Sequence, residues 1–327
     1  MALRNDPRIA GATKRRVLKI AAELGYKPDA KVTELMAHLR STRHQHGQAC
    51  LGVISFYETL RPWDHSLFFA RVYDGMKKRA DMMGYRLEPF GLRLPGMTSR
   101  RLREILDTRG IEGVVCFGSP DMNEELPPEL GHLALVSQGL SIRTPLHRVI
   151  NHGYNDMWRA LDRVYKLGYR RPGLAIGDYE EARSAHAHLS AYLGWCNLML
   201  NQPRTIPPFR SSNLEGPRLV SWLRRYKPDV LIFVHLHQHV QALPEALRRV
   251  GISIPGDLPV AAISHALQGT GMSGLEENAT LMGSRMIELL VAHLASRDFG
   301  IPDVPQIEMV ESQWVEGQSL PAAARED

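Results

Sequence analysis

The stretch Lys227-Pro228-Asp229-Val230-Leu231-Ile232-Phe233 contains a short apolar run, and similar runs recur along most of the chain. From Cys50 onward, these runs of about five residues alternate with stretches of helical periodicity. Short apolar runs are typical of parallel strands buried on both faces, and the helical stretches between them would be crossovers. We therefore expect an α/β fold built from doubly wound parallel sheets.

The pattern divides into two consecutive series, which predict two subdomains. In the first series we expect strands near 50–56, 85–90, 113–117, 133–137 and 147–151, and helices near 68–83, 98–109 and 122–130. In the second series we expect strands near 173–177, 206–210, 229–234, 258–263 and 305–311, and helices near 154–167, 184–201, 215–226, 238–250 and 279–296.

Charge is distributed unevenly along the 327 residues. Residues 1–46 carry ten Lys or Arg and four Asp or Glu, a net charge of +6, while the other 281 residues carry 30 basic and 31 acidic side chains. A basic segment attached to a neutral body indicates a polyanionic partner at one end. The alternative is the solvated face of an ordinary amphipathic helix.

One helix is expected over about Gly11–Leu24, and a second short helix is expected after Pro28. Asp29 can cap it, and apolar residues then recur at helical spacing, at Val32, Leu35, Met36 and Leu39. A helix of about three turns is marginal alone in water, so it needs a partner surface. That surface could be its own domain, a second copy of the chain, or DNA.

Several motifs resemble the LacI/GalR family of bacterial transcription regulators. They are Leu3-Arg-Asn, Thr13-Lys-Arg-Arg-Val17, Glu23-Leu-Gly-Tyr26-x-Pro28, Ser66-Leu-Phe68-Phe69-Ala, Leu167-Gly168-Tyr169-Arg170-Arg171-Pro172 and Gly251-Ile-x-Ile-Pro255-x-Asp257-Leu258-x-Val260. The resemblance implies a ligand-responsive regulator, in most cases a repressor, that binds a pseudo-palindromic operator as a homodimer. It implies an effector domain of periplasmic-binding-protein type.

The resemblance also assigns DNA-binding residues, at Arg4, Asn5, Lys14, Arg15, Lys31 and Leu35. Leu35 stands where the family's hinge helix inserts a leucine into the minor groove, which unstacks a base step. The alternative for Leu35 is packing of a linker helix on the body. Part of the helix-turn-helix is expected to be missing before Ala2, either because the chain is truncated or because its true start lies upstream.

The domain limits expected from the resemblance are discontinuous. They are 1–27 for a partial helix-turn-helix segment, 28–48 for the hinge helix and linker, 49–151 with 266–296 for one effector half, and 152–265 with 297–327 for the other. On the helix at 68–83, Val72, Met76 and Met83 could form a dimer face. The alternative for these side chains is core packing.

Ligands of open parallel sheets bind beyond the carboxyl ends of the strands. The residues expected to bind the effector are accordingly Trp63, Ser66, Phe68, His152, His186, His237 and His265. The four histidines stand at about the positions where the family carries Arg, Asp or Asn, and neutral imidazoles cannot form the bidentate contacts of Arg and Asp. We therefore expect an effector other than a neutral sugar, with an acidic ligand as the working hypothesis.

Other classes of function are less well supported. The spacing His235-x-His237-x-His239 raises the question of a metal site, but a polar cleft lining is the favoured interpretation, and no cofactor is expected. We find no nucleophile elbow, phosphate loop or dinucleotide fingerprint, so we expect no enzyme activity. Two rivals remain, a solute-binding protein of the same fold and a ligand sensor that has lost DNA binding.

The sequence also indicates a compartment. Cys50, Cys116 and Cys196 lie in apolar surroundings without metal-ligand spacing, as buried thiols do in a reducing cytoplasm. No signal peptide or membrane-spanning run is present in the sequence, so we expect a cytoplasmic protein without a membrane partner.

Overall fold

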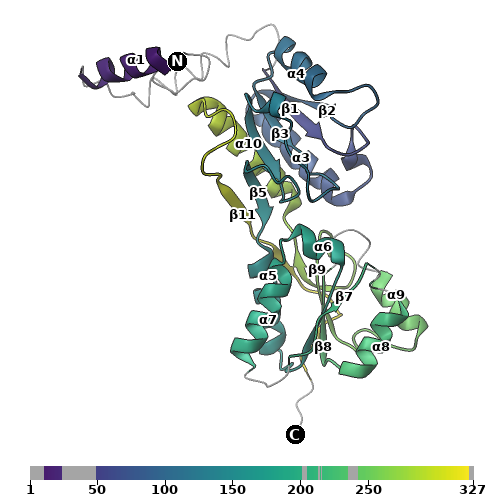
Figure 1. Ribbon diagram of the computed structural model, residues 1–327. Coiled ribbons are helices and arrows are strands. Elements are labelled where there is room, and N and C mark those ends of the chain that lie inside the picture. Colours follow the sequence, from purple (N-terminus) through teal and green to yellow (C-terminus); the bar gives the residue numbers. More distant parts are fainter. Residues whose placement is uncertain are drawn as a thin grey trace. The chain divides into compact units, whose positions relative to one another are not determined.

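The computed structural model describes residues 11–23, 49–200, 205–212, 214, 216–234 and 242–323. The chain forms two compact units (Figure 1). Unit 1 comprises Met1–Ile150 and Thr280–Glu308, and unit 2 comprises Asn151–Ala279 and Met309–Asp327. The chain thus changes unit after 150, 279 and 308.

Unit 1 is built on a six-stranded sheet in the order β11-β5-β4-β3-β1-β2. The strands are β1 (Ala49–Ser55), β2 (Tyr85–Gly91), β3 (Gly113–Cys116), β4 (Ala134–Gln138), β5 (His147–Asn151) and β11 (Ile307–Val310). Its helices are η2 (Pro62–Asp64), α3 (Leu67–Met82), α4 (Ser99–Thr108), η3 (Pro128–Leu130) and α10 (Ala279–Ser296). Because β1 pairs in parallel with both β2 and β3, strand order reverses beside β1.

Unit 2 repeats this plan with a sheet in the order β12-β10-β9-β8-β6-β7. The strands are β6 (Pro172–Ile176), β7 (Phe209–Arg210), β8 (Val230–Val234), β9 (Val260–Ser264), β10 (Ser273–Glu276) and β12 (Gln313–Val315). The helices are α5 (Gly153–Lys166), α6 (Asp178–Arg183), α7 (Ala187–Met199), α8 (Pro217–Tyr226) and α9 (Ala242–Arg249). In Figure 1, α5 and α7 are drawn on one side of this sheet and α8 and α9 on the other. Only β12 runs antiparallel to its neighbour among the ladders described.

Glycine brings α3 and α10 of unit 1 into backbone contact. A Cβ atom at Gly75 would lie 2.0 Å from the carbonyl oxygen of Thr280, and one at Gly283 would lie 1.9 Å from that of Val72. The Ser284 hydroxyl donates to the Gly75 carbonyl at 3.3 Å. These contacts place α10 directly against α3, so two helices that are far apart in the sequence pack together in unit 1.

This packing buries two residues that were expected at a dimer face. Val72 and Met76 are both 0% exposed, because the contact with α10 covers their side of α3. The core-packing alternative is therefore correct for them. The apolar side chains that α3 does expose are Leu67, 55% exposed, and Met82, 77% exposed.

The structure departs from the expected elements in three places. No helix forms over 122–130; Glu124 instead makes an isolated bridge to Ile142 and only η3 is helical, since Pro127 and Pro128 interrupt the segment. The expected helix at 184–201 begins only at Ala187, because Ala185 and His186 adopt left-handed backbone, and the short helix α6 before it was not expected. Strands β10 and β12 were not expected from the sequence.

Strand β10 also moves a domain limit. It pairs with β9, so residues 266–279 continue unit 2 rather than joining the other half, and residues 297–308 lie in unit 1. Of the N-terminal expectations, a helix is present as α1 (Gly11–Glu23), whereas the hinge helix and linker at 28–48 lie outside the described residues.

Two expectations about environment can also be compared with the structure. Cys116 and Cys196 are buried and Cys50 is partly buried, and all three are free thiols. Burial raises the pKa of Cys116 and that of Cys196, each to about 12. In the described part of the chain, no helix combines the length and the apolar character needed to cross a bilayer.

Replacing Gly283 by Ala should destabilise the protein by about 3 kcal/mol, because the added methyl group meets backbone that cannot rotate away. Denaturant unfolding of the purified chain measures this. The matched control is Gly194→Ala in α7, where the nearest atom to the new Cβ is 4.0 Å away. That change should be neutral or stabilising by about 0.5–1 kcal/mol. Equal effects of the two substitutions would contradict the contact.

Candidate functional site

The predicted ligand residues of unit 1 lie after β1, where they contact other residues of that unit. The Trp63 indole is 5% exposed and stacks on Tyr73, with ring centroids 3.9 Å apart. The Ser66 hydroxyl caps α3 by accepting a hydrogen bond from the Phe69 N–H, and the Phe68 side chain is 8% exposed. These contacts give each residue a structural role, while the Trp63 Nε1–H has no hydrogen-bond partner.

In unit 2, each of the three predicted histidines that the structure describes faces a carboxylate. The Nδ1 atom of His152 lies 2.8 Å from Glu311, that of His186 lies 2.9 Å from Glu181, and that of His265 lies 2.5 Å from Glu277. The fourth, His237, lies outside the described residues, as do His235 and His239. The carboxylates offset the positive charge that the acidic-ligand hypothesis requires of these histidines.

A group of buried polar side chains adjoins the His265–Glu277 pair. Asp156, in the first turn of α5, is 0% exposed and accepts a hydrogen bond from the Ser312 hydroxyl at 2.6 Å. Burial is the main cause that raises the pKa of Asp156 to about 7, and the negative charge of Glu277 raises it further. His188, in the first turn of α7, is also buried. Burial lowers the pKa of His188, and this effect outweighs the negative charges of Glu277 and Glu180, which raise it.

The sequence did not point to these buried residues. Glu277 follows β10 and its N–H donates to the Ser264 carbonyl, so it lies at the carboxyl ends of β9 and β10. Once β10 is known, Glu277 stands at a strand end as His265 does. Asp156 and His188 lie in the first turns of helices, and only the fold brings them near Glu277. The structure shows why position 153 is a glycine, because a Cβ atom there would lie 2.9 Å from the His188 ring.

A second cluster, in unit 1, has the composition of a metal site but not its geometry. It comprises His147, His293 and Asp298. The imidazole rings stack with centroids 3.9 Å apart and an interplanar angle of 17°, so one ion cannot lie in the plane of both rings. His147 Nδ1 accepts from the Gln306 N–H, which places its proton on Nε2, toward Asp298. The cluster is therefore a hydrogen-bonded tie between β5 and the end of α10.

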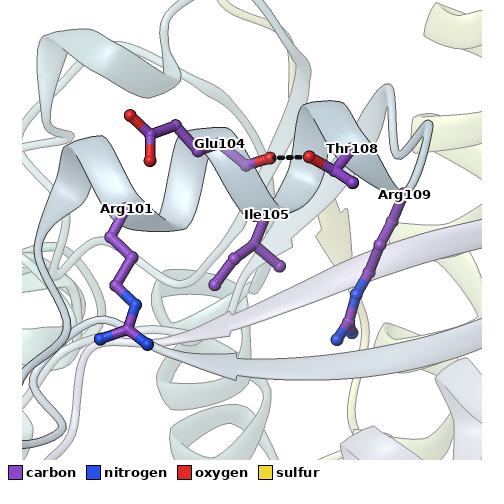
Figure 2. Close-up of a pocket in the computed structure, with 5 residues that line it drawn as sticks. All are labelled: Arg101, Glu104, Ile105, Thr108 and Arg109. Atoms are coloured by element: carbon purple, nitrogen blue, oxygen red, sulfur yellow. Dashed lines mark hydrogen bonds between the residues drawn. The ribbon is translucent and has the colours of Figure 1, made fainter.

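A pocket of about 370 Å³ lies on α4, away from the strand ends. Figure 2 shows Arg101 and Arg109 extending on the same side of the helix, with Ile105 between them. Arg101 donates to the Gly96 carbonyl at 3.2 Å, and Arg109 forms an ion pair with Glu88. Both guanidinium groups thus already have partners within unit 1.

Of the predicted DNA-binding residues, Lys14 and Arg15 lie in α1, and the Arg15 side chain is exposed. Arg4, Asn5, Lys31 and Leu35 lie outside the described residues. In the same helix Ile20 is 45% exposed. The DNA-binding assignments therefore remain predictions.

Substituting Asp156 by Asn should change the pH dependence of stability. Because the folded pKa is raised from 3.8 to about 7, the folded state binds the proton more tightly, and Asp156 lowers stability as pH rises through this window. Asp156→Asn removes that loss. Urea unfolding at about pH 5 and about pH 8 should show the variant gaining stability over the natural chain at the higher pH. An unchanged difference between the two pH values would contradict the shift.

The comparisons with known proteins agree with this architecture. Residues 161–320 match the family model described as a periplasmic binding protein-like domain. No curated protein matches the chain.

Solved structures with a similar fold include several regulators. The transcriptional regulator CelR in complex with cellobiose aligns with a TM-score of 0.58 and 16% identity over 97% of this chain and 94% of that one. The lac repressor dimer bound to operator and an anti-inducer aligns with a TM-score of 0.62 and 14% identity, over 98% of this chain and 94% of that one. A LacI transcriptional regulator from a Rhodococcus species aligns with a TM-score of 0.62 and 16% identity, over 84% of this chain and 100% of that one. Together these findings show that the chain shares the fold of these regulators, and that residues 161–320 match the model of the periplasmic binding protein-like domain.

Proposed function

We propose that this protein is a ligand-responsive transcription regulator of the repressor type. As a homodimer, it would bind a pseudo-palindromic operator through its N-terminal segment. A small-molecule effector would bind at the carboxyl ends of the strands. Binding would then change operator affinity, because a ligand that prefers one conformation shifts the population toward it.

The observation that carries this proposal is the combination of two similar α/β units with a basic segment ahead of them. The charge of +6 on residues 1–46 is opposite in sign to the phosphate backbone, while the rest of the chain carries 30 basic and 31 acidic side chains. The solved regulators named above share the fold, and one of them is a dimer bound to its operator. A solute-binding protein would not need the basic segment.

Selection of random duplex DNA by the purified chain tests the DNA-binding role. We expect enrichment of a near-symmetric site, with affinity that falls steeply with salt because phosphate contacts release counterions. Leu35→Ala should weaken binding to the selected site, and Lys14→Gln with Arg15→Gln should weaken binding to all duplexes. An exposed charge on unit 2 supplies the control, Arg249→Gln. If no site is enriched at low salt, the operator proposal is wrong and the ligand-sensor or solute-binding alternative takes its place.

The outer face of α3 is the proposed dimer contact, since it exposes Leu67 and Met82 beside the exposed Lys78–Asp74 ion pair. Replacing both Leu67 and Met82 by Asp should weaken the dimer by roughly 100-fold, because two charges enter an apolar contact. Sedimentation equilibrium measures this. Val250→Asp is the control, as Val250 is 42% exposed in unit 2. A dimer that survives the double substitution would exclude this face.

A further inference from the structure

The buried polar atoms near Glu277 that lack hydrogen-bond partners are mainly acceptors. Asp156 Oδ1 has no hydrogen bond, and the nearest cation, Arg159 of the same helix, lies 3.8 Å away. Arg159 itself donates to Glu311 and to the Ser312 carbonyl. A carboxylate oxygen can only accept when it is ionised, so each such atom calls for a donor.

His188 provides an independent observation. It is 2% exposed, and neither of its ring nitrogens has a hydrogen-bond partner. Because burial lowers its pKa, the ring is neutral near pH 7 and offers one acceptor and one donor. The His188 ring packs against the first turn of α5, which carries Asp156, because a Cβ atom at Gly153 would lie 2.9 Å from that ring. The charge of Glu277 acts on both His188 and Asp156. A buried imidazole without any partner is costly unless something else satisfies it.

The exposed fractions show how a ligand would approach. Asp156 and His188 are 0% and 2% exposed, whereas Glu277 is 3% and His265 is 8% exposed. His265 follows β9 at the strand end, where ligands of such sheets bind. A ligand would therefore meet His265 first, and Asp156, His188 and Glu277 lie deeper.

We propose that the effector carries a protonated amine, and that Asp156, His188 and Glu277 in unit 2 form the subsite for it. An ammonium group brings three donors and no acceptor, which matches a group of orphaned acceptors. A carboxylate or phosphate would add acceptors and negative charge to buried carboxylates, and its binding would be opposed. The inference rests on the proposed function only in taking the chain to respond to a small molecule.

The proposal predicts the direction of proton exchange when the ligand binds. A bound cation stabilises the ionised form of Asp156, so binding near pH 7 should release a proton and should weaken as pH falls. The groups that face the Asp156 carboxylate are the hydroxyl and backbone N–H of Ser312, Arg159 and the Glu277 carboxylate. Binding of an acidic ligand would instead take up protons.

The test uses the full chain and three sets of probes matched in size. The amines are 1,4-diaminobutane, agmatine, L-lysine and spermidine; 1,4-butanediol is the neutral probe and succinate the anionic one. Calorimetry in two buffers of different ionisation enthalpy gives affinity and proton exchange together. We expect binding by at least one amine with proton release, and none by the diol or succinate.

Two variants locate the subsite. Glu277→Gln should weaken amine binding by roughly 10- to 100-fold, the loss of one charge-assisted hydrogen bond. Asp156→Asn should retain weakened amine binding without the proton release, a combination that a loss of folding would not give. Glu245→Gln, an exposed carboxylate of α9, is the control and should bind as the natural chain does.

The proposal is overturned if no amine binds, if succinate binds instead, or if amine binding is unchanged in Glu277→Gln. The outcome is independent of the DNA test. If the chain selects an operator but binds no amine, the regulator proposal stands and the amine proposal is wrong. If it binds an amine but selects no operator, the amine proposal stands and the regulator proposal is wrong.

Discussion

Unit 1 depends on the place where two helices meet through their backbones. At Gly75 and Gly283 the separation of α3 and α10 is set by carbonyl groups, since any side chain there would overlap Thr280 or Val72. This closeness allows Met286 and Leu290 of α10 to be fully buried, and Leu294 lies against Gly113 of β3. Side-chain packing alone holds helix axes farther apart. The whole arrangement of sheet and helix in unit 1 therefore presupposes two glycines that are 208 residues apart.

Short apolar runs were sufficient to locate most of the parallel strands, because burial on both faces leaves an unambiguous sequence pattern. The pattern failed where pairing is decided by distant partners. Strand β10, Ser273-Gly274-Leu275-Glu276, is too short and mixed to be recognised, yet it pairs with β9 throughout. The apolar residues of the segment 122–130 have helical spacing, but its two adjacent prolines lack the N–H groups that a helix needs for its backbone hydrogen bonds.

The candidate site was predictable to the same extent. His152 and His265 stand at strand ends and could be found from the sequence. Their partners could not: Glu311 is 159 positions from His152, and Glu277 follows the unrecognised β10. The sign of the local charge depends on those partners. A hypothesis that counted only the histidines therefore arrived at an acidic ligand, while the paired carboxylates favour the opposite charge. The structural neighbours share the fold at 14–16% identity, a level at which the chemistry of strand ends must be determined for each chain separately.

The division of the chain at 150, 279 and 308 has a consequence for its biosynthesis. A ribosome releases the sequence from the N-terminus, and a domain folds when its last segment has emerged. Unit 1 begins first, but α10 is made only after nearly all of unit 2. During that interval Val72 and Met76 lack the surface that finally covers them. The nascent first half therefore keeps apolar side chains uncovered while most of unit 2 is synthesised, and both units are completed only by segments from the last part of the chain.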